Sequence, residues 1–140
     1  MDERSAIAYC MRLLARREYG RAILIDRLIA RDVAPEVART ALDSLSSDGL
    51  QSDERCAVAI IRTGERRGWS RRRTRQRMLK EGLDRAVMAA APWPDDDEER
   101  ARARRLFESL SAQQNDDRET QRKILARVAR RGFPVGHLFE

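Results

Sequence analysis

The strongest constraint on the fold is a period of fifty residues in the expected starts of helices. Gly20, Ser70 and Thr120 are all residues that are accepted as helix N-caps. Each precedes an eleven-residue stretch of helical composition, at 21–31, 71–81 and 121–131. A fixed period of this kind is typical of repeat architectures, in which each unit buries its apolar face against its neighbours.

The expected helix ends follow the same period. Asp32, Gly82 and Gly132 stand at equivalent places, one residue after these stretches, and an apolar residue follows each of them. The two glycines suit the left-handed position that closes a helix. Pro35 and Pro134 then stand where a next helix would begin, at a first-turn position that needs no N–H.

No strand pattern competes with this interpretation, because good helix formers dominate and no alternating β-branched run or Asn-Gly turn is present. We therefore predict an all-α protein of three tandem three-helix repeats in an elongated or curved array, spanning 1–50, 51–94 and 95–140. The expected helices are 4–17, 21–31 and 35–47, then 53–67, 71–81 and 84–91, and finally 97–114, 121–131 and 134–140.

The excess positive charge falls in the middle repeat. The chain has 29 basic and 23 acidic residues, a net charge of +6. The first and third repeats are each balanced, whereas 51–94 holds 11 basic and 5 acidic residues. A general preference for arginine would spread the charge evenly, so this distribution favours an acidic partner such as nucleic acid.

The centre of that charge is the segment 66–80. On a helix, Arg72, Arg73, Gln76, Arg77 and Lys80 share one side and Thr74, Met78 and Leu79 the other, with Arg71 and Arg75 at its edges. Arginine forks suit phosphate and carboxylate alike. The candidate binding residues are therefore Arg66, Arg67, Arg71, Arg72, Arg73, Arg75, Arg77 and Lys80, with Arg16, Arg17, Arg130 and Arg131 as a secondary set. A merely solvated helix face is the competing interpretation.

Trp69 lies beside this cluster and has two interpretations. It could stack on a nucleic-acid base or an arginine, or it could pack between helices as Tyr19 would at the equivalent place. The position of Tyr19 favours packing.

Catalytic and metal-binding constellations cannot be assembled from this sequence. His137 is the single histidine, the two cysteines are Cys10 and Cys56, and no Walker A loop or Gly-x-Gly-x-x-Gly motif occurs. Both cysteines stand among apolar residues and are expected to be buried, reduced thiols. We expect no enzyme activity, cofactor, small-molecule substrate or membrane association, and a cytoplasmic location.

Four motifs in order resemble the RecX family. They are Leu13 to Gly20 with Leu28; Leu45 with Asp53-Glu54-Arg55-Cys56-Ala57; Arg66-x-Gly68 with Arg73 and Leu79-x-x-Gly82-Leu83; and Leu125-Ala126-Arg127 with Arg130 to Pro134. The pattern departs from the family at Ile23, Asp32, Cys56, Thr74 and Arg77.

The resemblance implies a bacterial regulator of the RecA recombinase, built of three three-helix repeats. Such a protein would bind in the groove of the RecA–single-stranded-DNA filament and inhibit its ATPase, strand-exchange and co-protease activities, without chemistry of its own. Two alternatives stay open: a basic helical protein or repressor that binds single-stranded or duplex DNA independently of RecA, and a protein-interaction scaffold without nucleic acid.

Overall fold

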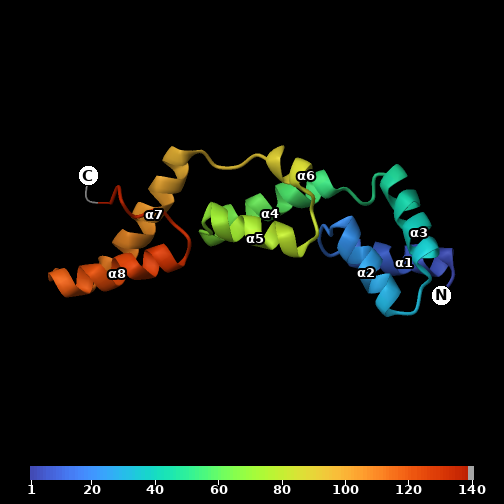
Figure 1. The fold of residues 1–140 in the computed structure, drawn as a ribbon, viewed down its shortest axis with the longest axis horizontal. Coiled ribbons are helices and arrows are strands. Elements are labelled where there is room, and N and C mark those ends of the chain that lie inside the picture. The colour runs from blue at the N-terminus through green and yellow to red at the C-terminus, as the bar shows by residue number, and fades with distance from the viewer. Residues whose placement is uncertain (139–140) are drawn as a thin grey trace. The chain divides into compact units, whose positions relative to one another are not determined.

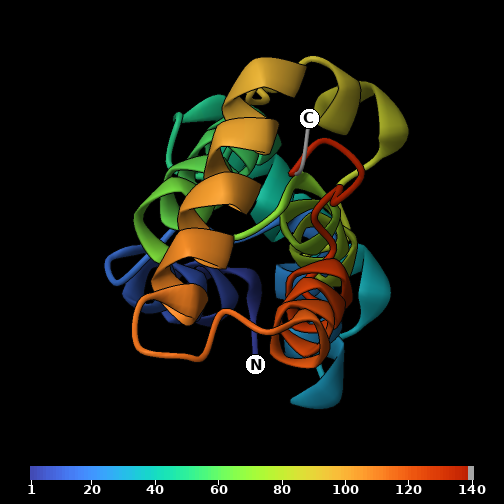
Figure 2. The same cartoon turned by 90° about the vertical axis from the view of Figure 1, so that its left-hand side faces the viewer.

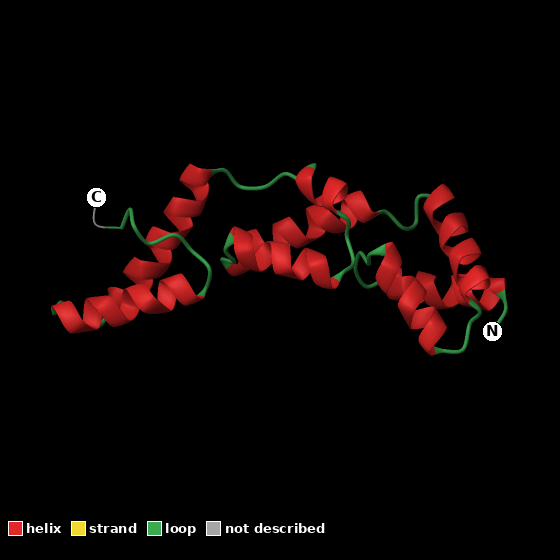
Figure 3. Cartoon of the chain, in the orientation of Figure 1, coloured by secondary structure: helices red, strands yellow, loops and turns green. Residues whose placement is uncertain are grey.

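The computed structural model describes residues 1–138, and these residues form eight helices and no strand (Figure 1). The bounds are α1 Glu3–Leu14, α2 Arg21–Ala30, α3 Pro35–Ser47, α4 Asp53–Arg67, α5 Arg71–Lys80, α6 Arg85–Ala89, α7 Asp96–Ser111 and α8 Arg118–Arg130. Only helix and loop appear in the described part of the chain (Figure 3). The all-α prediction is confirmed. None of the helices in residues 1–138 is long and apolar enough to cross a membrane.

The chain divides into two compact units. Unit 1 contains residues 1–60 and 77–91, and unit 2 contains 61–76 and 92–140, so that α4 and α5 each contribute to both. The boundaries between the three predicted repeats, at 50/51 and 94/95, stay a prediction.

The core of unit 1 is built from α1, α2 and α3. Cys10, Leu24, Leu28 and Leu42 are fully buried in it, because the apolar positions of each helix recur at helical spacing on one face. Cys10 is a free thiol, as is the buried Cys56 on α4. Burial raises the pKa of these thiols to about 11 and about 12, and both are free and buried, as predicted.

In unit 2, α7 packs against α8. The two helices are joined by the loop at residues 112–117 (Figure 2), and Ala103, Ile124, Val128 and Phe133 form their shared core. The expected helix at 134–140 is wrong over its described part, because residues 134–138 contain only a turn at 136–138. Phe139 and Glu140 lie outside the described residues.

The helix caps confirm much of the fifty-residue pattern. Gly20 is the N-cap of α2, and the Ser70 hydroxyl accepts a hydrogen bond from the Arg73 N–H at the start of α5. Gly82 and Gly132 adopt φ values of +75° and +93°, in the left-handed region. Asp32, which replaces glycine at the equivalent place, also adopts a positive φ of 66°.

The prediction for Thr120 was wrong. The N-cap of α8 is Asp117, whose carboxylate accepts hydrogen bonds from both the N–H and the hydroxyl of Thr120. Aspartate is the stronger cap, and its negative charge faces the positive end of the helix. The helix therefore begins three residues earlier than the period indicates.

Candidate nucleic-acid interface

The segment before α2 docks onto a buried acid in unit 1, an arrangement that we call the first junction (Tyr19, Gly20 and Arg21 with Gln51, Asp53 and Glu81). The N–H of Gly20 donates to Glu81 Oε2 at 3.2 Å, and the N–H of Arg21 donates to Asp53 Oδ1 at 2.9 Å. The Gln51 amide donates to the carbonyl of Tyr19 at 3.2 Å. The bonds to Glu81 and Asp53 satisfy N–H groups that the start of a helix leaves without partners.

Glu81 is only 2% exposed and carries two arginines on one oxygen. Arg17 Nη1 lies 2.8 Å and Arg77 Nη1 2.9 Å from Glu81 Oε1. Burial alone would raise the pKa of Glu81, but the Gly20 N–H and the two guanidinium groups outweigh it and hold that pKa below its ordinary value. Arg17 and Arg77 are therefore bound to the protein itself.

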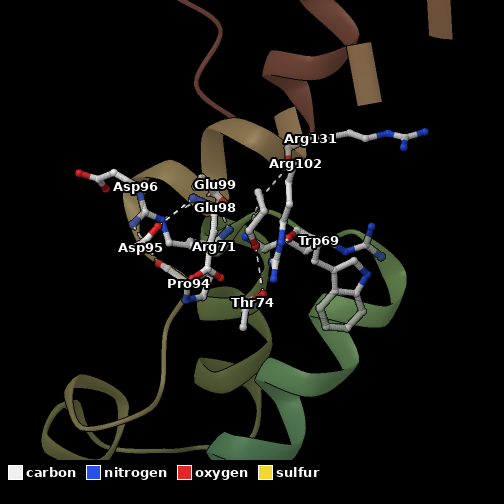
Figure 4. Close-up of polar contacts among 12 residues, drawn as sticks. Trp69, Arg71, Thr74, Pro94, Asp95, Asp96, Glu98, Glu99, Arg102 and Arg131 are labelled. Atoms are coloured by element: carbon white, nitrogen blue, oxygen red, sulfur yellow. Dashed lines mark hydrogen bonds and ion pairs between the residues drawn. The ribbon is translucent and has the colours of Figure 1, made fainter. Parts of the chain in front are cut away.

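The segment before α5 docks in the same way in unit 2. We call this the second junction (Trp69, Ser70 and Arg71 with Glu99, Arg102 and Arg131), and Figure 4 shows its contacts. The N–H of Arg71 donates to Glu99 Oε2 at 2.8 Å, and the Ser70 hydroxyl donates to the Arg131 carbonyl at 2.8 Å. Arg102 Nη1 donates to the Trp69 carbonyl at 3.3 Å.

The fifty-residue period thus extends to tertiary contacts. Residues 19, 20, 21 and 81 of the first junction correspond to 69, 70, 71 and 131 of the second. In both, the carbonyl of the first residue and the N–H of the third are satisfied by side chains, while the 20–81 contact uses the Glu81 carboxylate and the 70–131 contact uses the Ser70 hydroxyl. Only the cap and breaker residues carried this period in the sequence.

The second junction also binds Arg71. Its Nη2 lies 2.8 Å from Asp96 Oδ1, and its Nη1 donates to the carbonyl of Pro94 at 3.3 Å (Figure 4). Arg71 was expected to extend along the edge of the helix to solvent. Instead, the acids at the start of α7 hold it, so it is not available to a partner.

The remaining candidates in the middle of the chain have no acidic partner. Among residues 1–138, Arg66, Arg67, Arg72, Arg73, Arg75 and Lys80 are exposed and form no ion pair. Arg66 donates to the Thr63 hydroxyl, and Arg73 and Arg75 lie over the rings of Trp69 and Trp93. These six residues are the uncommitted cations of the predicted site.

Trp69 serves packing, as its likeness to Tyr19 indicated. It is 8% exposed, and Arg73 and Arg67 lie over its ring at 4.8 Å and 5.9 Å from the centroid. Its indole also faces Gly64, where an added Cβ would lie 3.5 Å from the ring. The burial of the ring supports the packing interpretation.

Leu79 differs from the prediction. It was placed on the inner side of the helix with Thr74 and Met78, both of which are buried, but it is 59% exposed. The buried side of α5 is centred between Thr74 and Met78, which are four residues apart and stacked on one face. Leu79 is one residue further along and turns toward solvent.

In the secondary set, Arg16, Arg130 and Arg131 are exposed, and no ion pair within residues 1–138 holds them. Arg17 is the exception, bound to Glu81 in the first junction.

The only histidine is engaged in the fold. His137 Nε2 lies 3.2 Å from the carbonyl of Arg100, and the His137 carbonyl accepts a hydrogen bond from Arg104. Within the described residues no group of three histidines, cysteines or acids could hold a metal ion.

Comparison with known proteins decides the family. A model of the first three-helix domain of RecX matches residues 6–45. Regulatory protein RecX of Xanthomonas axonopodis pv. citri (strain 306) is 32% identical over 132 residues, which are 94% of this chain and 82% of that protein. This chain belongs to the RecX family of regulatory proteins.

Other RecX proteins agree. Regulatory protein RecX of Stenotrophomonas maltophilia (strain K279a) is 34% identical over 135 residues, covering 94% of this chain and 81% of that protein. The crystal structure of RecX from Lactobacillus salivarius matches with a TM-score of 0.81 at 19% identity, over 95% of this chain and 89% of that one. A second solved RecX structure gives a TM-score of 0.80 at 17% identity, over 94% and 68%. These two structures share the all-helical fold.

Proposed function

We propose that this RecX-family chain binds the RecA–single-stranded-DNA filament in the cytoplasm and lowers the ATPase, strand-exchange and co-protease activities of RecA, without catalysing a reaction. The observation that carries the proposal is the division among its cations. Arg17, Arg71 and Arg77 are held by acids, whereas Arg66, Arg67, Arg72, Arg73, Arg75 and Lys80 are exposed without acidic partners.

Uncompensated charge of this kind favours a polyanionic partner. Neighbouring arginines on one helix repel each other by a few tenths of a kcal/mol per pair, and a bound phosphate backbone removes that repulsion. A filament offers both DNA phosphates and a protein surface. Arginine suits such a partner better than lysine, because the planar guanidinium binds phosphate and carboxylate with two parallel hydrogen bonds.

The test compares one DNA with and without RecA. A fluorescent oligo-dT is titrated with the full chain, first bare and then coated by RecA with a non-hydrolysable ATP analogue. We expect the coated strand to bind more tightly, and the affinity for both forms to fall as salt rises. Equal or weaker binding to the coated strand would overturn the proposal.

The second candidate is a helical DNA-binding protein that acts independently of RecA. The exposed arginines of α5 suit it as well, because they can bind DNA phosphates whether or not RecA coats the strand. It predicts a footprint on duplex DNA at a defined sequence, and the filament regulator predicts none.

A further inference from the structure

A second basic helix lies outside the middle repeat. The third repeat is neutral in total, which conceals how its charges are distributed. Its acids gather at Asp95 to Glu99, the N-cap and first turn of α7, and at Asp116 and Asp117, just before α8. Helix α8 and the residue after it carry Arg118, Arg122, Lys123, Arg127, Arg130 and Arg131 and a single acid, Glu119.

Nearly all of these cations are uncommitted. Lys123 pairs with Glu119 at 3.5 Å, and within residues 1–138 no ion pair engages the five arginines, all of which are exposed. The buried side of α8 is set by Ile124 and Val128. On the opposite half, Arg122, Arg127 and Arg130 cover about 12 Å of helix at 1.5 Å per residue.

The second junction brings this helix to the start of α5 within unit 2. The Ser70 hydroxyl binds the Arg131 carbonyl, while the Arg131 side chain extends away from the junction (Figure 4). A Cβ placed on Gly132 would lie 2.6 Å from Ser70 Oγ and 3.2 Å from Arg72 Cβ. The bare glycine therefore lets the stem of Arg72 pack against the turn that ends α8.

We propose that α8 is a second phosphate-binding helix, and that Arg72, Arg73, Arg130 and Arg131 join it to α5 as one track for a nucleic-acid strand. This rests on the proposed function, because it extends the surface that meets the DNA of the filament. About 12 Å of helix matches roughly three to four phosphates at the 3.4 Å spacing of one strand.

The chemistry of α8 favours nucleic acid over an acidic protein. Protein interfaces place apolar and aromatic anchors at their centre. The large hydrophobic side chains that are well exposed in the described part of the chain are Met1, Met11, Ile29, Leu50 and Leu79, and none of them is on α8. A face of arginines without such an anchor suits phosphates.

The experiment measures the salt dependence of oligo-dT binding by the full chain. The α8 variant carries Arg122→Gln, Arg127→Gln and Arg130→Gln, and the matched control carries Arg4→Gln, Arg12→Gln and Arg85→Gln, three exposed arginines of unit 1. If three phosphate contacts are lost, the slope of log affinity against log salt falls by about 2, and affinity near 0.1 M salt falls roughly 30- to 100-fold. The control should match the wild type.

A third variant, with Arg122→Lys, Arg127→Lys and Arg130→Lys, keeps the charge of α8. It should restore the wild-type slope, which would show that the glutamine variant lost charge contacts and not its fold.

A variant of α5 with Arg72→Gln and Arg73→Gln separates the two proposals. If the α5 variant loses affinity and the α8 variant does not, the second helix is ruled out and the proposed function stands. If the wild type does not bind the strand at all, both lose their basis. If only inhibition of RecA is lost, α8 binds protein and the inference is wrong.

Discussion

The two junctions place corresponding residues alike but direct their charges differently. At the first, Glu81 turns inward and holds Arg17 and Arg77. At the second, the corresponding residue is Arg131, which gives only its carbonyl to the junction, and the buried acid is Glu99 from α7. The same repeat geometry therefore holds Arg17 and Arg77 at the first junction, whereas at the second it holds Arg71 and leaves the side chain of Arg131 exposed.

The two buried acids differ in how fully they are satisfied. Glu81 accepts from three donors. Glu99 Oε2 accepts the Arg71 N–H and lies 3.8 Å from Arg71 Nε, while Glu99 Oε1 is buried without a hydrogen-bond partner. Neutralising Glu81 should therefore lower the free energy of unfolding far more than neutralising Glu99.

The largest expected effect comes from Glu81→Gln. It leaves two guanidinium groups beside an amide that cannot neutralise them, and we expect a loss of about 2–3 kcal/mol in the free energy of unfolding. Glu99→Gln is the matched comparison, with an expected loss below about 1 kcal/mol. Urea denaturation of the two variants measures both values. Equal losses would contradict the claim that the charge of Glu81 contributes more to stability than that of Glu99.

Swapping the small residues of the two junctions should have the next largest effect. A side chain on Gly20 would collide with the backbone carbonyl of Glu81, so Gly20→Ser should cost about 1–3 kcal/mol. Ser70→Gly loses one hydrogen bond to Arg131 and a cap that glycine partly replaces, at a cost of about 1 kcal/mol. Thermal melting of both variants tests this order, and a milder effect at Gly20 would contradict the tight packing.

Acid should weaken the first junction selectively. The pKa of Glu81 lies below its ordinary 4.5 in the folded protein, so its stabilisation is complete above that pH and is lost as pH falls through the lower folded value. The difference in unfolding free energy between the wild type and Glu81→Gln should therefore narrow as the pH falls below about 4.5. A difference that stays constant as the pH falls would show that the Glu81 charge contributes nothing.

The smallest expected effect is a gain in stability, from Asp32→Gly. Asp32 adopts the left-handed conformation that Gly82 and Gly132 adopt at the equivalent places. Glycine has no Cβ to strain there, so Asp32→Gly should stabilise the protein by about 0.5–1 kcal/mol. Gly82→Asp is the reverse change and should destabilise it. Differential scanning calorimetry would detect both shifts, and a loss of stability in Asp32→Gly would show that the carboxylate has a role of its own.

Much of the fold could be predicted from caps and breakers, because they act within a few residues. The bounds of α3 and α4 and the left-handed turns at Gly82 and Gly132 follow from such local signals. The helix expected after Pro134 does not form in residues 134–138, since a proline permits a first turn but does not supply the contacts that stabilise a helix.

The candidate site was harder to predict, because a residue's availability depends on distant partners. Arg17 meets Glu81 from 64 residues away, and Arg71 meets Glu99 from 28. No periodicity shows which arginine an acid will hold. Counting charge by repeat also concealed α8, because the acids that balance its cations in the third repeat lie mostly outside the helix. Counting charge by expected helix would have revealed the basic helix.

The most direct test of the account is the rate of ATP hydrolysis by RecA on single-stranded DNA, titrated with the full chain. We predict inhibition near stoichiometric amounts by the wild type and by the control with Arg4, Arg12 and Arg85 replaced. The variant with Arg72→Gln and Arg73→Gln should inhibit far less. It should melt only a few degrees below the wild type, because it breaks no ion pair and the contact of Arg73 with the Trp69 ring contributes about 0.5–1 kcal/mol. An unchanged ATPase rate with the wild-type chain, at a salt concentration where it still binds DNA, would contradict the account.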